Sequence, residues 1–206
     1  MVNVSTVEIH YNELLARLGY SHNKTRLDIK IISSIRENLS LAQKLIKPKS
    51  AIAVENITLH GNLVSFENGY KIKSNNIATL LKNCFKAYGI VVTIGNALEK
   101  KRDDCLKKRE IFEALILDAA GSVAAEETIT LANSQIKAYE EKNDNILTRR
   151  YSPGYGDWSL EANKQFLNWI GTTRIGITLN KSYHMKPEKS VSALIGIKKL
   201  ACNATV

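Results

Sequence analysis

The segment at positions 149–158, which reads RRYSPGYGDW, constrains this chain more than any other, because it combines a rigid turn with cations and aromatic rings and has no apolar periodicity. Pro153 fixes its own φ and drives Ser152 toward an extended backbone. The two glycines that follow can adopt positive φ and let a ligand approach the backbone. Arg150 adds a planar fork suited to a carboxylate or phosphate, and the aromatic rings offer faces for a ring or an onium cation. The segment therefore predicts either a ligand-binding loop or, more simply, a turn that closes a hairpin.

Length and composition indicate a single globular domain. A chain of 206 residues can bury well over half of its unfolded surface without metals or disulfides. Its hydrophobic share of 44% and charged share of 24% are ordinary for such a domain. Three scattered cysteines are too few for a disulfide framework, and neither a secretory signal nor a membrane-spanning apolar run is present. We expect a cytoplasmic protein.

The formal net charge of +9 favours an acidic partner, either nucleic acid or the acidic face of another protein. No nucleic-acid module is present, and cations are not interleaved with stacking aromatics, which argues against nucleic acid. The four histidines lack the spacing of a metal site, and no Walker loop or Gly-rich dinucleotide motif occurs. We therefore assign no catalytic residue and no metal ligand.

Hydrophobic periodicity and turn signals predict the secondary structure. Helices are expected at 8–19, 27–46, 77–86, from about 96, at 103–142 with a break near Gly121, and at 160–169. Strands are expected at 51–59, 62–67, 70–73, 88–94, 174–179 and 190–197. The Asn68-Gly69 turn favours antiparallel pairing of the strands beside it. The chain is therefore expected to form one compact α+β domain over residues 1–206.

One carboxylate on the long predicted helix stands out. The helix has an apolar stripe formed by Phe112, Leu115, Ala119, Val123 and Thr130. Glu126 follows Leu115 by eleven residues and Ala119 by seven, which predicts that it lies on the apolar side. A carboxylate there must be paired or must serve a ligand, unless it bonds a nearby loop or lies at the edge of the stripe. Glu127 is the second candidate for this ligand-binding carboxylate, after Glu126.

The second half of the chain resembles the activation (reactivation) domain of cobalamin-dependent methionine synthase, in its stand-alone form. Four ordered blocks carry the resemblance, and they lie at 117–122 together with Glu126, at 147–158, at 174–179 and at 187–193. The N-terminal half matches more loosely. The resemblance implies a twisted, mainly antiparallel sheet with flanking helices. It also implies a helical and strand region over 1–90 and a binding core over 91–198.

The resemblance implies a function as well as a fold. In that family the domain binds S-adenosylmethionine and presents its methyl group to a corrinoid that has been oxidised to Co(II). An electron from a flavodoxin-like donor completes the reductive methylation. The cobalamin is expected on a partner such as methionine synthase, because this chain has no Asp-x-His-x-x-Gly motif. The alternatives are a scaffold that docks on a corrinoid protein without binding S-adenosylmethionine, and a basic nucleic-acid-binding protein.

Individual residues can be carried over from the family's Arg-x-x-Pro-Gly-Tyr pattern. The resemblance puts Arg150 on the carboxylate of the ligand and Glu126 at its ammonium or sulfonium end. It also puts the backbone of Ser152, Gly154 and Tyr155, in the turn that contains Pro153, around the adenine. The full-length enzymes also have an N-terminal Asp without a match in this chain, and a Tyr where this chain has Ile195. His184 is a further candidate for the corrinoid edge, or simply a surface or core histidine.

Overall fold

The computed structural model describes residues 2–21 and 28–200. The helices are α1 (Tyr11–Arg17), α2 (Ile29–Leu45), α3 (Asn75–Leu80), α4 (Ala97–Lys107), α5 (Ile111–Glu141) and α6 (Asn163–Ile170), with 3-10 turns η1 (Leu160–Ala162) and η2 (Thr172–Ile175). The strands are β1 (Lys49–His60), β2 (Leu63–Phe66), β3 (Lys71–Lys73), β4 (Lys86–Thr93), β5 (Asn145–Leu147), β6 (Thr178–Leu179), β7 (Met185–Lys186) and β8 (Ser190–Lys199). The start of the helix predicted at 27–46 lies outside the described residues.

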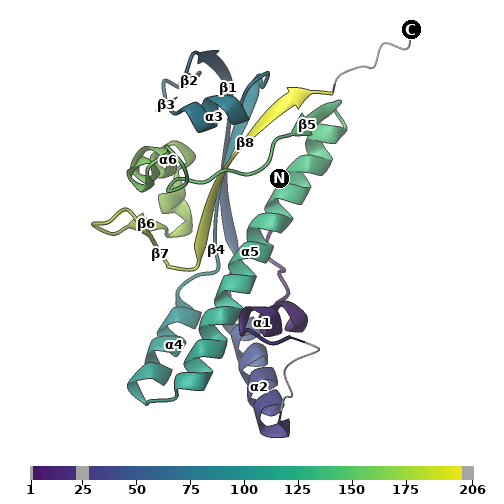
Figure 1. Cartoon of the computed structure of the whole chain (residues 1–206), viewed down its shortest axis with the longest axis vertical. Coiled ribbons are helices and arrows are strands. Elements are labelled where there is room, and N and C mark those ends of the chain that lie inside the picture. The colour runs from purple at the N-terminus through teal and green to yellow at the C-terminus, as the bar shows by residue number, and fades with distance from the viewer. Residues whose placement is uncertain (1, 22–27, 201–206) are drawn as a thin grey trace.

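Six strands form one sheet in the order β3-β2-β1-β4-β8-β5, and each neighbouring pair is antiparallel. The pair β6 and β7 forms a separate short hairpin. Helices flank the sheet on both sides (Figure 1). The predicted α+β class with a mainly antiparallel sheet is therefore confirmed.

The central strands β4 and β8 are buried on both faces. Alternate residues of β4, namely Tyr88, Ile90 and Val92, pack with the Ile129 side of α5. The residues between them face the other way, where Val91 packs with Phe166 of α6. Figure 1 shows α5 crossing one side of the sheet and α6 on the opposite side. Because helices cover both faces of these strands, their sequences are continuous apolar runs.

The long predicted helix is two helices. The chain turns at Arg109, which has a left-handed φ of 64°, so α4 ends before this turn and α5 begins after it. The predicted start at residue 103 was therefore wrong. No break occurs at Gly121, which lies inside α5, is buried and lets α4 pack closely. A Cβ there would lie 2.6 Å from Leu98 Cδ2.

Two other predicted segments differ from the structure. The helix predicted at 77–86 ends at Leu80, since the chain must turn to enter β4. In the strand predicted at 174–179, the first two residues belong to the 3-10 turn η2, and only Thr178–Leu179 is extended. Gly176 has φ 81° and interrupts that run, so Ile175 and Ile177 do not join the strand that begins at Thr178.

A helical base lies beyond one end of the sheet. There, α1, α2 and α4 pack around the first half of α5 (Figure 1). Their apolar side chains form a core of their own that includes Leu14, Ile35 and Leu117, all fully buried. Within residues 2–21 and 28–200, no helix is both long and apolar enough to cross a bilayer.

Candidate functional site

The 149–158 segment forms a loop that is attached to the sheet and closed on itself. Tyr151 exchanges backbone hydrogen bonds with Leu194 of β8, at 3.0 and 2.8 Å. Gly154 N donates to Trp158 O at 2.7 Å, and Gly154 adopts φ 96°. The positive φ is the conformation that the sequence predicted for this glycine. These hydrogen bonds occupy several of the backbone N–H and C=O groups of the loop.

Asp157 fixes the other end of the loop. Its carboxylate accepts hydrogen bonds from Ser74 Oγ at 2.5 Å and from the backbone N of Asn75 at 2.6 Å, at the start of α3. The Ser74 bond, and then the backbone N–H groups of Asn75 and Asn76, lower the pKa of Asp157 against the opposing effect of burial. The loop is thus held between β8 and α3.

We expect Asp157→Asn to lower the melting temperature at pH 7. A group whose pKa is lower in the folded state adds stability above its unfolded pKa and loses it as the pH falls through the folded value. The difference between wild type and Asp157→Asn should therefore shrink as the pH falls below about 3.8. Thermal melts between pH 2 and 7 measure this, and a difference that stays constant would contradict the assigned role.

Two adjoining hollows lie beside the loop, each of about 490 Å³. The Arg150 hollow is lined by Glu126, Ile129, Arg149, Arg150, Tyr151, Ser152, Tyr155, Gly156, Val191 and Ala193. The His184 hollow is lined by Ser152, Pro153, Tyr155, Leu160, Asn163, Asn180, His184, Met185, Lys186, Glu188, Ser190, Val191 and Ser192. Both volumes fall in the range of small-molecule sites.

Arg150 and Glu126 form an ion pair in the Arg150 hollow. Arg150 Nη2 lies 2.5 Å from Glu126 Oε1, and the side chains are 31% and 54% exposed. The prediction that Glu126 lies on the apolar side was therefore wrong. The stripe used for that prediction included Leu115 and Thr130, both of which are exposed, because several elements cover α5 over a broader arc. The alternative, in which Glu126 bonds a nearby loop, is the one observed.

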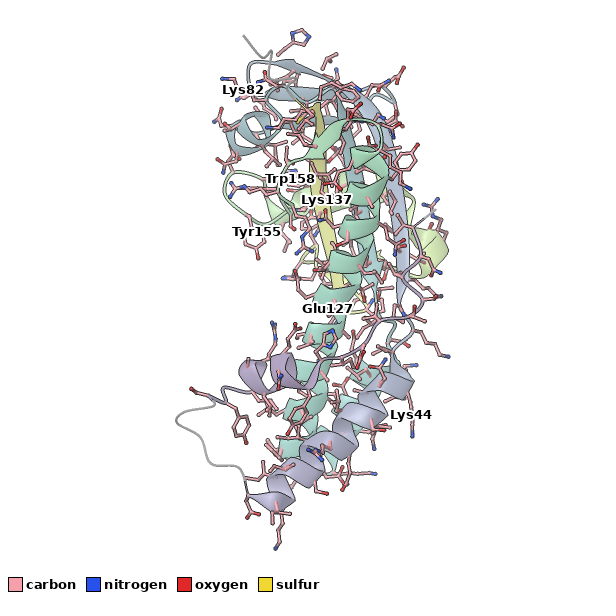
Figure 2. All side chains as sticks on the ribbon, turned by 90° about the vertical axis from the view of Figure 1, so that its right-hand side faces the viewer. Lys44, Lys82, Glu127, Lys137, Tyr155 and Trp158 are labelled. Carbon is pink, nitrogen blue, oxygen red and sulfur yellow. The ribbon has the colours of Figure 1, made fainter. Side chains whose placement is uncertain are left out.

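The other predicted site residues occupy different positions around the two hollows. Ser152 and Tyr155 line both, and Ser152 Oγ donates to the backbone O of Ser192 at 2.6 Å. Tyr155 is 68% exposed and projects from the body of the protein (Figure 2). Pro153 is buried and lines only the His184 hollow. Gly154 lines neither hollow and serves the turn.

An ion network holds the chain at 187–190, where it enters β8 beside the hollows. Lys189 Nζ lies 2.8 Å from Asp118 Oδ1, and Arg102 Nη1 lies 3.0 Å from the same oxygen. Burial opposes ionisation of Asp118, but the hydrogen bonds from Lys189 and Arg102 outweigh it and lower its pKa. The buried Glu99 also accepts a bond from the Lys189 backbone N at 2.8 Å. The network joins two of the four sequence blocks and fixes the start of β8.

The helix α1 packs against α5, a contact that sequence spacing did not predict. Glu127 is half-buried where α1 meets α5 (Figure 2). Burial and then the nearby Glu13 raise the pKa of Glu127, while His10 opposes the shift. Within the described ranges, no group of three or more His, Cys, Asp or Glu side chains could hold a metal ion.

Two positions noted in the sequence have plain structural outcomes. Ile195 is fully buried in the core beneath α5 and lines neither hollow. His184 is exposed and lines the hollow named after it. At this hollow, α6 and the β6–β7 hairpin meet the loop. The sequence did not predict this contact, because Asn163 and His184 lie far apart along the chain.

The fold and the two hollows define an α+β domain with ligand-sized sites between a Pro-Gly loop and the end of a sheet. The structure is similar to the crystal structure of the MetH reactivation domain bound to AdoHcy, with a TM-score of 0.62 and 12% sequence identity. The match covers 91% of this chain and 73% of that one. No protein-family model and no curated protein matches the sequence. The chain thus has the fold of that reactivation domain.

Proposed function

We propose that this protein binds S-adenosylmethionine in the Arg150 hollow and supports reductive methylation of a Co(II) corrinoid held by a partner protein such as methionine synthase. The observation that carries the proposal is the Arg150–Glu126 pair, because it places opposite charges side by side in a hollow of about 490 Å³. The solved structure with the same fold has AdoHcy bound. The lining residues of the hollow all lie within the proposed binding core, 91–198.

The ion pair suits a ligand with an amino-acid end. In a zwitterion, the carboxylate can take the place of Glu126 at Arg150, and the ammonium can take the place of Arg150 at Glu126. Each side chain then exchanges one opposite charge for another. Because the pair is partly exposed, opening it costs no more than about 1 kcal/mol. A ligand that lacks either charge leaves one side chain without its partner.

The remaining residues have roles in positioning the ligand and in docking. S-adenosylmethionine supplies a methyl group bonded to a sulfonium. The loop backbone near Ser152 and Tyr155 can contact an adenine, and both hollows are open to a docking protein. The net charge of +9 favours an acidic corrinoid protein and an acidic flavodoxin-like electron donor. These partners are part of the proposal.

Calorimetric titration tests the binding step. We expect saturable 1:1 binding of S-adenosylmethionine and of S-adenosylhomocysteine, since both carry the amino-acid end. Methylthioadenosine lacks that end and should bind at least about tenfold more weakly, because it loses the charge-assisted contacts. No detectable binding of S-adenosylmethionine at millimolar concentration, or equal affinity for methylthioadenosine, would count against the proposed site.

Glu126→Gln should weaken S-adenosylmethionine binding about fivefold or more and leave the melting temperature nearly unchanged. The lost charge-assisted contact is worth about 1.5–3 kcal/mol, more than the cost of opening the ion pair. Glu141→Gln is the matched control, because Glu141 lies on the same helix and pairs with Lys137 at a similar exposure, 53%. Calorimetry and thermal melts measure the two effects. A large loss of stability with intact binding would make Glu126 a structural carboxylate.

A further inference from the structure

The long strand β1 has a strand beside only part of one of its edges. β4 pairs with β1 from its first residue onward, whereas β2 pairs only with its last four residues, 57–60. Glu67 N donates to Asn56 O at 3.1 Å, and after this bond the chain turns toward β3. Among the residues that the structure describes, no strand pairs with this side of β1 at 49–55, which we call the open edge.

The backbone groups of the open edge point away from the sheet. Ile57 donates its N–H to Phe85 O on the β4 side at 3.0 Å, whereas the residue before it accepts from the β2 side. Because backbone groups alternate in direction along a strand, Ser50, Ile52 and Val54 direct their N–H and C=O groups outward. Apart from Ile52 O, these groups have no hydrogen-bond partner within the described ranges. Such an edge is a template for another extended chain.

The open edge is complementary to itself. When two copies are paired antiparallel about Ile52, Ser50 of one copy lies opposite Val54 of the other, and Lys49 lies opposite Glu55. This register gives every outward N–H and C=O group a partner, and by symmetry it places opposite charges across from each other twice. Neither Lys49 nor Glu55 forms an ion pair with another described residue.

We propose that the open edge pairs with the same edge of a second copy of this chain, which joins two six-stranded sheets into one. The open edge begins at the first residue of β1 and ends where Glu67 binds Asn56, so Ile52 lies at its middle. The register that matches the charges is therefore also the one that uses the whole edge. No residue of the open edge lines the Arg150 hollow or the His184 hollow, so this proposal is independent of the proposed function.

Arg174 covers the middle of the open edge in the single chain. Its Nη2 donates to Ile52 O at 3.3 Å, and its side chain is exposed. Charged side chains commonly protect an edge strand from pairing. In the dimer this side chain moves aside, because Ile52 O accepts from the second copy. We therefore expect Arg174→Ala to strengthen the dimer about two- to tenfold, the effect of one hydrogen bond.

Sedimentation equilibrium of the full chain, from about 10 µM to about 1 mM, suits the weak association expected of so small an interface. The average mass should rise across this range from that of one chain toward that of two. Lys49→Glu and Glu55→Lys should each weaken the dimer about tenfold or more, because like charges then face each other, and the double variant should restore it. Lys71→Glu is the matched control, since Lys71 is exposed on the edge strand β3 and lies outside the open edge.

Val54→Pro tests the backbone hydrogen bonds of the dimer. The N–H that proline lacks points outward and has no partner in the single chain, and proline is tolerated on an edge. The variant should keep its melting temperature nearly unchanged. It should weaken the dimer about tenfold or more, because one bond is lost on each side of the two-fold axis.

Three results would overturn the proposal. The first is a wild-type chain that stays monomeric at the highest concentration. The second is a dimer that neither Val54→Pro nor the single charge reversals weaken, since it would then form through another surface. The third is a double charge variant that associates as weakly as the single variants, which would contradict the pairing of Lys49 with Glu55.

Discussion

Arg150→Ala should weaken S-adenosylmethionine binding by about 1.5–3 kcal/mol, which corresponds to a loss of 10- to 150-fold in affinity. The guanidinium is the group in the hollow best suited to two parallel bonds with a carboxylate. Its present partner, Glu126, is partly exposed and easily displaced. The fold should survive, because the Arg150 side chain is 31% exposed and its ion pair contributes little to stability. Calorimetry of the variant measures the loss.

Arg149→Ala is the control for this variant. Arg149 lines the same hollow and carries the same charge, but its guanidinium lies 6.0 Å from the Tyr151 ring centroid, which is a weaker contact. We expect a smaller loss of affinity from Arg149→Ala than from Arg150→Ala. Equal losses would show that only the positive field of the hollow matters. Unchanged affinity in Arg150→Ala would remove this residue from the site.

Gly154→Val should reduce binding at least as much as Arg150→Ala, and should also destabilise the fold by about 1–3 kcal/mol. Gly154 has φ 96°, which a β-branched residue rarely adopts, and a Cβ there would lie 3.3 Å from Leu160 Cδ1. Relief of this strain would shift the backbone between Ser152 and Tyr155, which line both hollows.

Gly176→Val is the control that shows whether backbone strain at a glycine outside the hollows weakens binding. Gly176 has a similar φ of 81°, open space around its Cβ position, and no place in either hollow. This variant should lose stability and keep its affinity. Denaturant unfolding and calorimetry of both variants measure the two effects. Tight binding by Gly154→Val would refute the role assigned to the loop backbone.

The sequence predicted well those features that depend on local chemistry. The continuous apolar runs of β4 and β8, the periodicity of α2 and the conformational freedom of Gly154 were enough to predict these features. The end of α4 was missed because Arg109, which is neither glycine nor asparagine, adopts the left-handed conformation there. Sequence spacing did not predict this turn.

Tertiary packing explains the remaining differences. Glu126 was placed on the wrong face of the helix, since periodicity could not show which elements would cover α5, and its role in binding stays a proposal. The open edge of β1 exists because β2 pairs with only part of that strand, which no local motif revealed. The division into regions 1–90 and 91–198 stays a proposal, although β1 and β4 pair across it within one sheet.

The most direct test is reductive methylation in trans. A Co(II) corrinoid protein is mixed with this protein, S-adenosylmethionine and a chemical reductant, and the methylcobalamin absorption spectrum is followed at low and moderate ionic strength. We predict faster methylation with the wild-type protein than without it, and slower methylation with Arg150→Ala. The acceleration should fall with added salt, because the Debye length shortens from about 10 Å at 0.1 M to 3 Å at 1 M. A rate that the protein leaves unchanged at every salt concentration would contradict the proposed function.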